Sequence, residues 1–96
     1  MSKFSEITKE MESLYTKKNT DYGNSFDKTL NEFGILPAVI RLSEKVDRLK
    51  AYCKNNAISV KDESIKDTLI DLANYAVMTR MWLDNDLSSN NSNSTI

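Results

Sequence analysis

Two stretches of the sequence carry carboxylates at helical spacing. The first pair is Glu44 and Asp47, and the second set is Glu63, Asp67 and Asp71, continued by the amide of Asn74, at spacings of four, four and three residues. On a helix the second set stays within a sector of about 80°. Neighbouring carboxylates repel one another unless a cation lies among them, and clusters of oxygen ligands suit magnesium or manganese. Two such helices packed side by side would hold magnesium against a triphosphate.

The same acidic pattern has a simpler interpretation, because acidic residues on helices usually form a solvated face. Against that interpretation, Asp67, Asp71 and Asn74 share their side of the helix with apolar residues such as Ile70 and Met78. The spacing therefore leaves both the metal site and the solvated face open.

Basic and aromatic residues close to these acids are candidates for contacts with a nucleotide. Lysine and arginine are natural partners of phosphate oxygens. Tyr22 precedes Gly23, and a glycine lets the backbone approach a stacked base closely. Lys45 is a further basic candidate, although an exposed lysine often serves only solubility. The predicted substrate contacts are Lys17, Lys18, Asn19, Asp21, Tyr22, Arg41, Arg48 and Asn74.

Composition excludes several classes of chemistry. The chain has no histidine, which removes Ser-His and Cys-His nucleophiles and imidazole zinc sites. Cys53 is the single cysteine and is expected to be a buried thiol. A net charge of −1 argues against a protein that binds duplex DNA. No apolar run approaches the roughly 20 residues that span a bilayer, and the N-terminus lacks the apolar stretch of a signal peptide, so a cytoplasmic protein is expected.

The elements that must position these residues are helices. A chain of 96 residues with only two glycines and one proline favours a single all-α domain over many short strands. A first helix, capped by Ser2 or Ser5, is expected to end near Lys17, before a turn. A short helix with Ser25 as its N-cap is expected to end at Gly34 in a left-handed C-cap.

Two longer helices complete the predicted bundle of three main helices and one short one. Pro37 fits the first turn of a helix over about 37–54, whose apolar stripe is Val39, Leu42, Val46, Leu49 and Cys53. The last helix, about 62–85 with Asp62 as its cap, is apolar on nearly all sides, which predicts packing against another subunit in a homo-oligomer. The domain is expected to cover 1–85, and the Ser/Asn-rich segment 86–96 to be a disordered tail.

Three blocks of the sequence resemble a known family. They are KKNTDYGNSF, EFGILPAVIRLSEKVDRL and DESIKDTLIDLANYAVM, and they run from about Lys17 to Met81. In this order they resemble the phage and bacterial family called nucleotide modification associated domain type 1. That resemblance implies a connection with nucleotide metabolism and leaves the reaction unspecified.

A looser similarity links Glu44-x2-Asp47 and Asp71-Leu72-Ala73-Asn74 to the all-α nucleoside triphosphate pyrophosphohydrolases of the MazG and dimeric dUTPase type. Those enzymes form dimers or tetramers and bind magnesium through an ExxE and an ExxD motif. The similarity implies that Glu44, Asp47 and Asp71 are magnesium ligands. Asn74 replaces the last acid of the pattern, and Asp67, one turn before Asp71, is the residue that would restore the charge.

These observations predict a phage-type nucleotide-handling protein. The leading hypothesis is a magnesium-dependent nucleoside triphosphate pyrophosphohydrolase, with Glu44, Asp47, Asp67 and Asp71 as its metal ligands and catalytic groups. The nearly equal alternative is a protein that binds a nucleotide or cyclic nucleotide without hydrolysing it and so sequesters a signal. A purely structural helical module ranks third.

Overall fold

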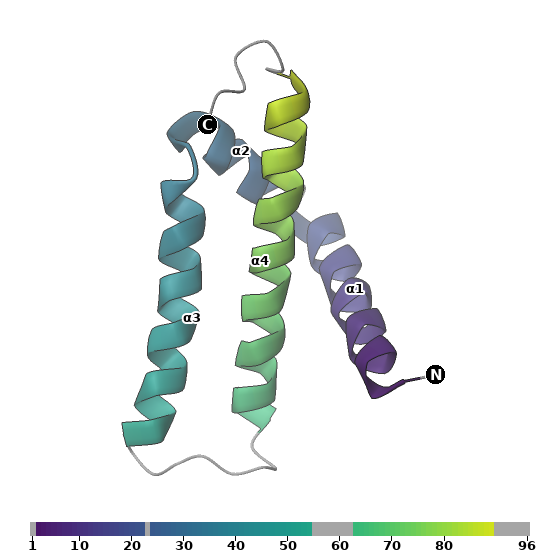
Figure 1. Cartoon of the computed structure of the whole chain (residues 1–96), viewed down its shortest axis with the longest axis vertical. Helices are drawn as coiled ribbons and strands as arrows, with labels where there is room; N and C mark the ends of the chain where they lie inside the picture. Colours follow the sequence, from purple (N-terminus) through teal and green to yellow (C-terminus); the bar gives the residue numbers. More distant parts are fainter. Residues whose placement is uncertain (1, 23, 55–62, 90–96) are drawn as a thin grey trace.

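The computed structural model describes the backbone of residues 2–22, 24–54 and 63–89, which is helical apart from the short connections. Over these ranges the helices are α1 (Lys3–Tyr22), α2 (Ser25–Phe33), α3 (Leu36–Lys54) and α4 (Glu63–Ser89), and no strand is present (Figure 1). The expected all-α fold, with three main helices and one short helix, is confirmed. None of the described helices is both long and apolar enough to cross a membrane.

The first helix begins as predicted and ends later than predicted. Ser2 caps it, because the Ser5 backbone N–H donates to Ser2 Oγ at 3.1 Å. The predicted end near Lys17 is wrong, since α1 continues to Tyr22. No glycine or proline stands between Lys17 and Tyr22, and Lys18 forms an ion pair with Asp71 of α4 that ties down the additional turn.

The corners on either side of α2 depend on two residues with positive φ. The N-cap is Asn24 at φ 61° and ψ 22°, without a side-chain capping bond, so the prediction that Ser25 is the cap is wrong. Asparagine tolerates this left-handed conformation better than serine does. At the other end, the N–H of Gly34 donates to the Leu30 carbonyl at 2.8 Å, which closes the helix as expected. Gly34 has the expected positive φ of 82°, but its ψ of −162° lies outside the left-handed helical region.

Helices α3 and α4 form an antiparallel pair; in Figure 1, α2 and the end of α1 pass behind this pair, and the rest of α1 extends to the right of α4. Among the described residues, the fully buried apolar side chains are Leu30 and Ala38. Thr68 and Thr79 are also buried, and each hydroxyl donates to the carbonyl one turn earlier, at 2.8 and 2.7 Å, so neither is left unsatisfied. The core of a single copy is therefore small.

The face that α3 presents to α4 is rotated from the predicted stripe. Leu42 and Leu49 are half-buried as expected, but Val39, Val46 and Cys53 are exposed. The prediction of a buried thiol at Cys53 is therefore wrong for the single chain. The inner positions are Ala38, Leu42, Lys45, Leu49 and Tyr52, which places a lysine in the line of core residues.

The end of α4 also differs from its predicted boundary. The helix continues to Ser89, four residues into the segment that the sequence assigned to a disordered tail. The predicted cap Asp62 and the segment 90–96 lie outside the described residues. Only one chain is described, so the homo-oligomer expected from the sequence stays a prediction.

Candidate functional site

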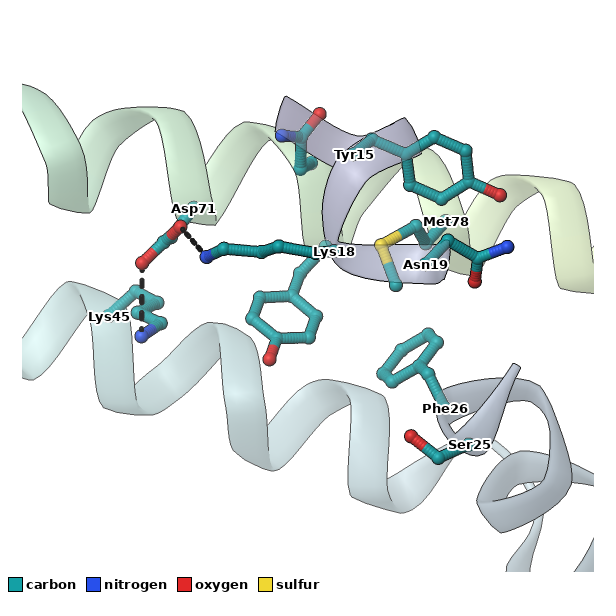
Figure 2. Close-up of a pocket in the computed structure, with 10 residues that line it drawn as sticks. Tyr15, Lys18, Asn19, Ser25, Phe26, Lys45, Asp71 and Met78 are labelled. Carbon is teal, nitrogen blue, oxygen red and sulfur yellow. Dashed lines mark hydrogen bonds and ion pairs between the residues drawn. The ribbon is translucent and has the colours of Figure 1, made fainter. Parts of the chain in front are cut away.

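A pocket of about 340 Å³ lies where the four helices meet (Figure 2). Ligand sites in proteins have volumes of roughly 300–1,000 Å³, so the pocket has the size of a small-molecule site. It is lined by Tyr15, Lys18, Asn19, Ser25, Phe26, Lys45, Asp71, Asn74, Tyr75 and Met78.

The helical repeat explains why these side chains converge. Asp71, Asn74, Tyr75 and Met78 follow one another at three, one and three residues, which is one face of α4. Tyr15, Lys18 and Asn19 follow one another at three and one residues on α1. The last turn of α1 extends over the pocket only because the helix continues past Lys17.

The polar part of the pocket is one carboxylate held between two lysines from different helices (Figure 2). Lys18 Nζ of α1 lies 3.3 Å from Asp71 Oδ1, and Lys45 Nζ of α3 lies 3.5 Å from Oδ2. The side chain of Lys45 is only 17% exposed and that of Asp71 25%, whereas Lys18 is half exposed. The cluster carries two positive charges and one negative charge, so the pocket has a surplus of positive charge.

Aromatic rings form the other part of the pocket. The rings of Phe26 and Tyr75 lie 5.4 Å apart between centroids, tilted by 53°. Lys45 Nζ lies 5.9 Å from the centroid of the Tyr75 ring, within cation–π range. Tyr15 and Met78 add further apolar surface to the lining. The pocket thus joins a cationic end to an aromatic end.

Asn74 has a different task from the one its motif suggested. Its Nδ2 donates a hydrogen bond to the Met11 carbonyl at 3.1 Å, across the α1–α4 contact. An aspartate has no proton to donate at this position, so the amide is suited to joining the two helices. Asn74 also lines the pocket, and its side chain connects α1 to α4.

The predicted metal ligands are not gathered at one point. Glu44 forms an ion pair with Arg41 at 3.2 Å, with both side chains 56% exposed, and Asp47 and Asp67 are exposed. No group of three or more His, Cys, Asp or Glu residues in the described part of the chain is placed to hold a metal ion. Both oxygens of Asp71 face ammonium groups. This donor set does not fit the expected magnesium site, which stays a prediction.

The other predicted contacts divide into two groups. Lys18, Asn19, Asp71 and Asn74 line the pocket, together with the further basic candidate Lys45. Lys17 and Arg48 are exposed and are not among its lining residues. The side chains of Asp21 and Tyr22 lie outside the described residues.

Sequence reasoning did not assign a binding role to half of the pocket. The lining residues it missed are Tyr15, Ser25, Phe26, Tyr75 and Met78. Met78 was recognised only as an apolar neighbour of the acidic stripe on the last helix. The available signal was the stripe of spacing three, one and three that continues from Asp71 and Asn74 to Tyr75 and Met78.

Comparison with protein families identifies the class to which this helical domain belongs. The model of nucleotide modification associated domain 1 matches residues 18–83, more than two thirds of the chain, and this match includes the pocket residues of α2, α3 and α4. The chain belongs to that family. No curated protein and no solved structure matches the chain significantly, and no comparison supports the looser similarity to the MazG enzymes.

Proposed function

We propose that this protein binds a nucleotide or cyclic nucleotide in the pocket without hydrolysing it. The observation that carries the proposal is the convergence of Lys18 and Lys45, from two helices, on one carboxylate beside three aromatic side chains. Membership of a family associated with nucleotide modification agrees with such a ligand.

The phosphate end of the ligand would replace Asp71 as the partner of the two lysines. Each lysine has a flexible stem and three donors, so it can turn from a carboxylate to a phosphate oxygen. Asp71 meanwhile keeps both ammonium groups in the pocket before the ligand arrives. A charge-assisted hydrogen bond of this kind contributes about 1.5–3 kcal/mol.

The base would lie against the aromatic end, formed by Tyr15, Phe26 and Tyr75. Stacking of a base on an aromatic side chain contributes about 1–3 kcal/mol and tolerates different bases. A pocket of about 340 Å³ lies near the lower limit for small-molecule sites, which favours a single nucleoside unit in each pocket.

Hydrolysis is the less supported of the two predicted functions. Metal-assisted attack of water on a triphosphate needs several oxygen ligands around the cation. Among the lining residues Asp71 is the one acid, and its oxygens are engaged by lysines. The cationic groups of the pocket favour binding of the phosphates over assembly of a metal centre.

Calorimetric titration with a panel of nucleoside triphosphates, deoxynucleoside triphosphates and cyclic nucleotides tests the proposal. Each titration is run with magnesium and again with EDTA, and the nucleotide is then recovered and analysed. We expect binding of at least one member at the same affinity in both buffers, with the ligand recovered intact. Loss of binding in EDTA, or recovery of a monophosphate and pyrophosphate, would overturn the proposal in favour of the magnesium-dependent enzyme.

A further inference from the structure

One broad face of the α3–α4 pair is covered by no described element. In Figure 1, α2 and the end of α1 pass behind this pair, the rest of α1 extends beside α4, and no described helix lies in front, so the face toward the viewer is formed by α3 and α4. Exposed apolar side chains of both helices belong to it. We call it the hairpin face and define it by Val39, Val46 and Cys53 of α3 and Leu69 and Ala76 of α4.

Helical geometry places these residues on one side. At 100° per residue, Val46 lies about 100° around α3 from Lys45, and Ala76 about 100° around α4 from Tyr75. Asn74, which binds α1, lies about 100° from Tyr75 in the opposite direction. On each helix the next residue after the inward-facing one is turned by about 100° in the direction of the helical winding. Because α3 and α4 are antiparallel, this turn brings Val46 and Ala76 to the same side of the pair, away from α1. Val39 and Cys53 then follow at seven residues from Val46, and Leu69 at seven from Ala76.

The hairpin face is apolar and strongly exposed. Val39 is 46% exposed, Val46 38% and Leu69 49%. The same rotation places Lys50 and Arg80 at the rim of the face, and Arg80 is already paired with Asp84 at 3.1 Å. Apolar surface of this extent on a soluble domain normally marks an interface.

We propose that a second copy of this chain covers the hairpin face. The face runs along the whole of α3, whose 19 residues from Leu36 to Lys54 make it about 28 Å long, and two helices are about 20 Å wide. Two such faces therefore bury roughly 1,100 Å² in total, which reaches the area of about 1,000 Å² that a specific interface needs.

Two further observations favour a second copy over another occupant. In the described part of the single chain, the fully buried apolar side chains are Leu30 and Ala38. Packing against a second copy would bury more apolar side chains and so enlarge this small core. Two copies of an antiparallel helix pair, related by a two-fold axis, can also pack face to face. The result is a four-helix bundle in which both copies use the same surface. This proposal does not depend on the identity of the ligand.

Light scattering of the full chain tests the proposal against a matched control. The interface variant is the double substitution V46R/L69R, and the control is I40R, since Ile40 is 48% exposed but points about 120° away from Val46 around α3. We expect the wild type and I40R to have the mass of a dimer or a larger even multiple at micromolar concentration. V46R/L69R should have the mass of one chain, with helical circular dichroism. A monomeric wild type, or a double variant that retains the wild-type mass, overturns the proposal.

The reactivity of Cys53 provides a second test, which is made on the wild-type chain and needs no substitution. The thiol is exposed in the single chain and lies on the hairpin face, so its rate of reaction with a small disulfide reagent reports whether the face is covered. A second copy predicts slow reaction at high protein concentration and faster reaction on dilution. A rate that is slow but independent of concentration indicates a cover from the same chain, and a uniformly fast rate indicates an open face. Either of these two results contradicts the proposal.

Discussion

The spacing of Asp71 on its helix is compatible with two different roles, a metal ligand and a partner of lysines. In the sequence it belongs to an acidic stripe that resembles a metal-binding set. In the structure its two oxygens meet Lys18 and Lys45 from other helices. The partners that decide its role are 53 and 26 positions away in the sequence, so the spacing along its own helix carries no information about them.

Lys45 is the residue on which phosphate binding should depend most. Replacement by methionine keeps the length of the half-buried stem and removes the ammonium group. We expect K45M to weaken nucleotide binding by about 1.5–3 kcal/mol, which is roughly a tenfold to hundredfold rise in Kd by calorimetry. The control is K28M, because Lys28 is an exposed lysine of α2 outside the pocket lining. Equal affinity of K45M and K28M would remove Lys45 from the site.

The substitution D71N separates the two interpretations of this carboxylate by the sign of its effect. In the observed cluster it leaves two ammonium groups without their counter-charge. We expect a loss of about 1 kcal/mol or less, because Lys18 is half exposed, and hence a melting temperature lower by a few degrees. Nucleotide affinity should rise, because the carboxylate no longer competes with phosphate. E32Q, at an exposed acid of α2 outside the pocket lining, is the control in differential scanning calorimetry.

A rise in melting temperature for D71N would have the opposite meaning. It would indicate that the carboxylate is repelled by neighbouring acids, as an empty magnesium site requires. Loss of nucleotide binding together with that rise would favour the metal-dependent hypothesis.

At the scale of the helices, the sequence was sufficient for the number and type of elements and insufficient for their orientation. The apolar period and the few glycines and prolines predicted all four helices, and the sequence narrowed the first cap to Ser2 or Ser5, because these are local effects. The end of α1 was misplaced because Lys18 is held in the helix by its ion pair with Asp71, which belongs to α4. The inner face of α3 was rotated because Lys45 occupies a core position whose partners, Asp71 and Tyr75, belong to another helix.

The bond from Asn74 to the Met11 carbonyl should control how α1 docks. The substitution N74D gives the sequence the acid that the MazG pattern has, but it replaces a donor by a charged acceptor beside a carbonyl oxygen. We expect a loss of about 1–3 kcal/mol in the free energy of unfolding measured with urea, and no gain in magnesium affinity. N85D, at an exposed asparagine of the same helix, should change stability little. Tighter magnesium binding by N74D without destabilisation would contradict this role.

The turn between α2 and α3 should tolerate only glycine at position 34. An added Cβ at Gly34 would meet no atom within 4 Å, so any cost comes from the backbone and not from packing. With φ 82° and ψ −162°, the residue occupies a region that is essentially restricted to glycine. We expect G34A to lose about 1–3 kcal/mol in urea denaturation. N24G, at the left-handed N-cap of α2, should be neutral or stabilising, and an unchanged stability of G34A would show that the turn relaxes into another conformation.

At the scale of the whole molecule, the pocket proposed to bind a nucleotide and the face proposed to form the dimer lie on opposite sides of the α3–α4 pair. The pocket lies toward α1 and α2, and the hairpin face lies on the other side. In the proposed dimer each pocket would therefore stay open and be formed by one chain. The two sides share the helices α3 and α4 but no side chain that we assign to both.

This separation predicts that assembly and nucleotide binding respond to different substitutions. V46R/L69R should give single chains that bind the nucleotide with the wild-type Kd and a stoichiometry of one per chain in calorimetry. Its melting temperature should no longer rise with protein concentration, as that of the wild type should, because dissociation is coupled to unfolding only in the assembly. K45M should show the reverse pattern, with the wild-type mass and weakened binding. A stoichiometry of one nucleotide per two chains, lost together with the dimer, would show instead that both copies contribute to each site.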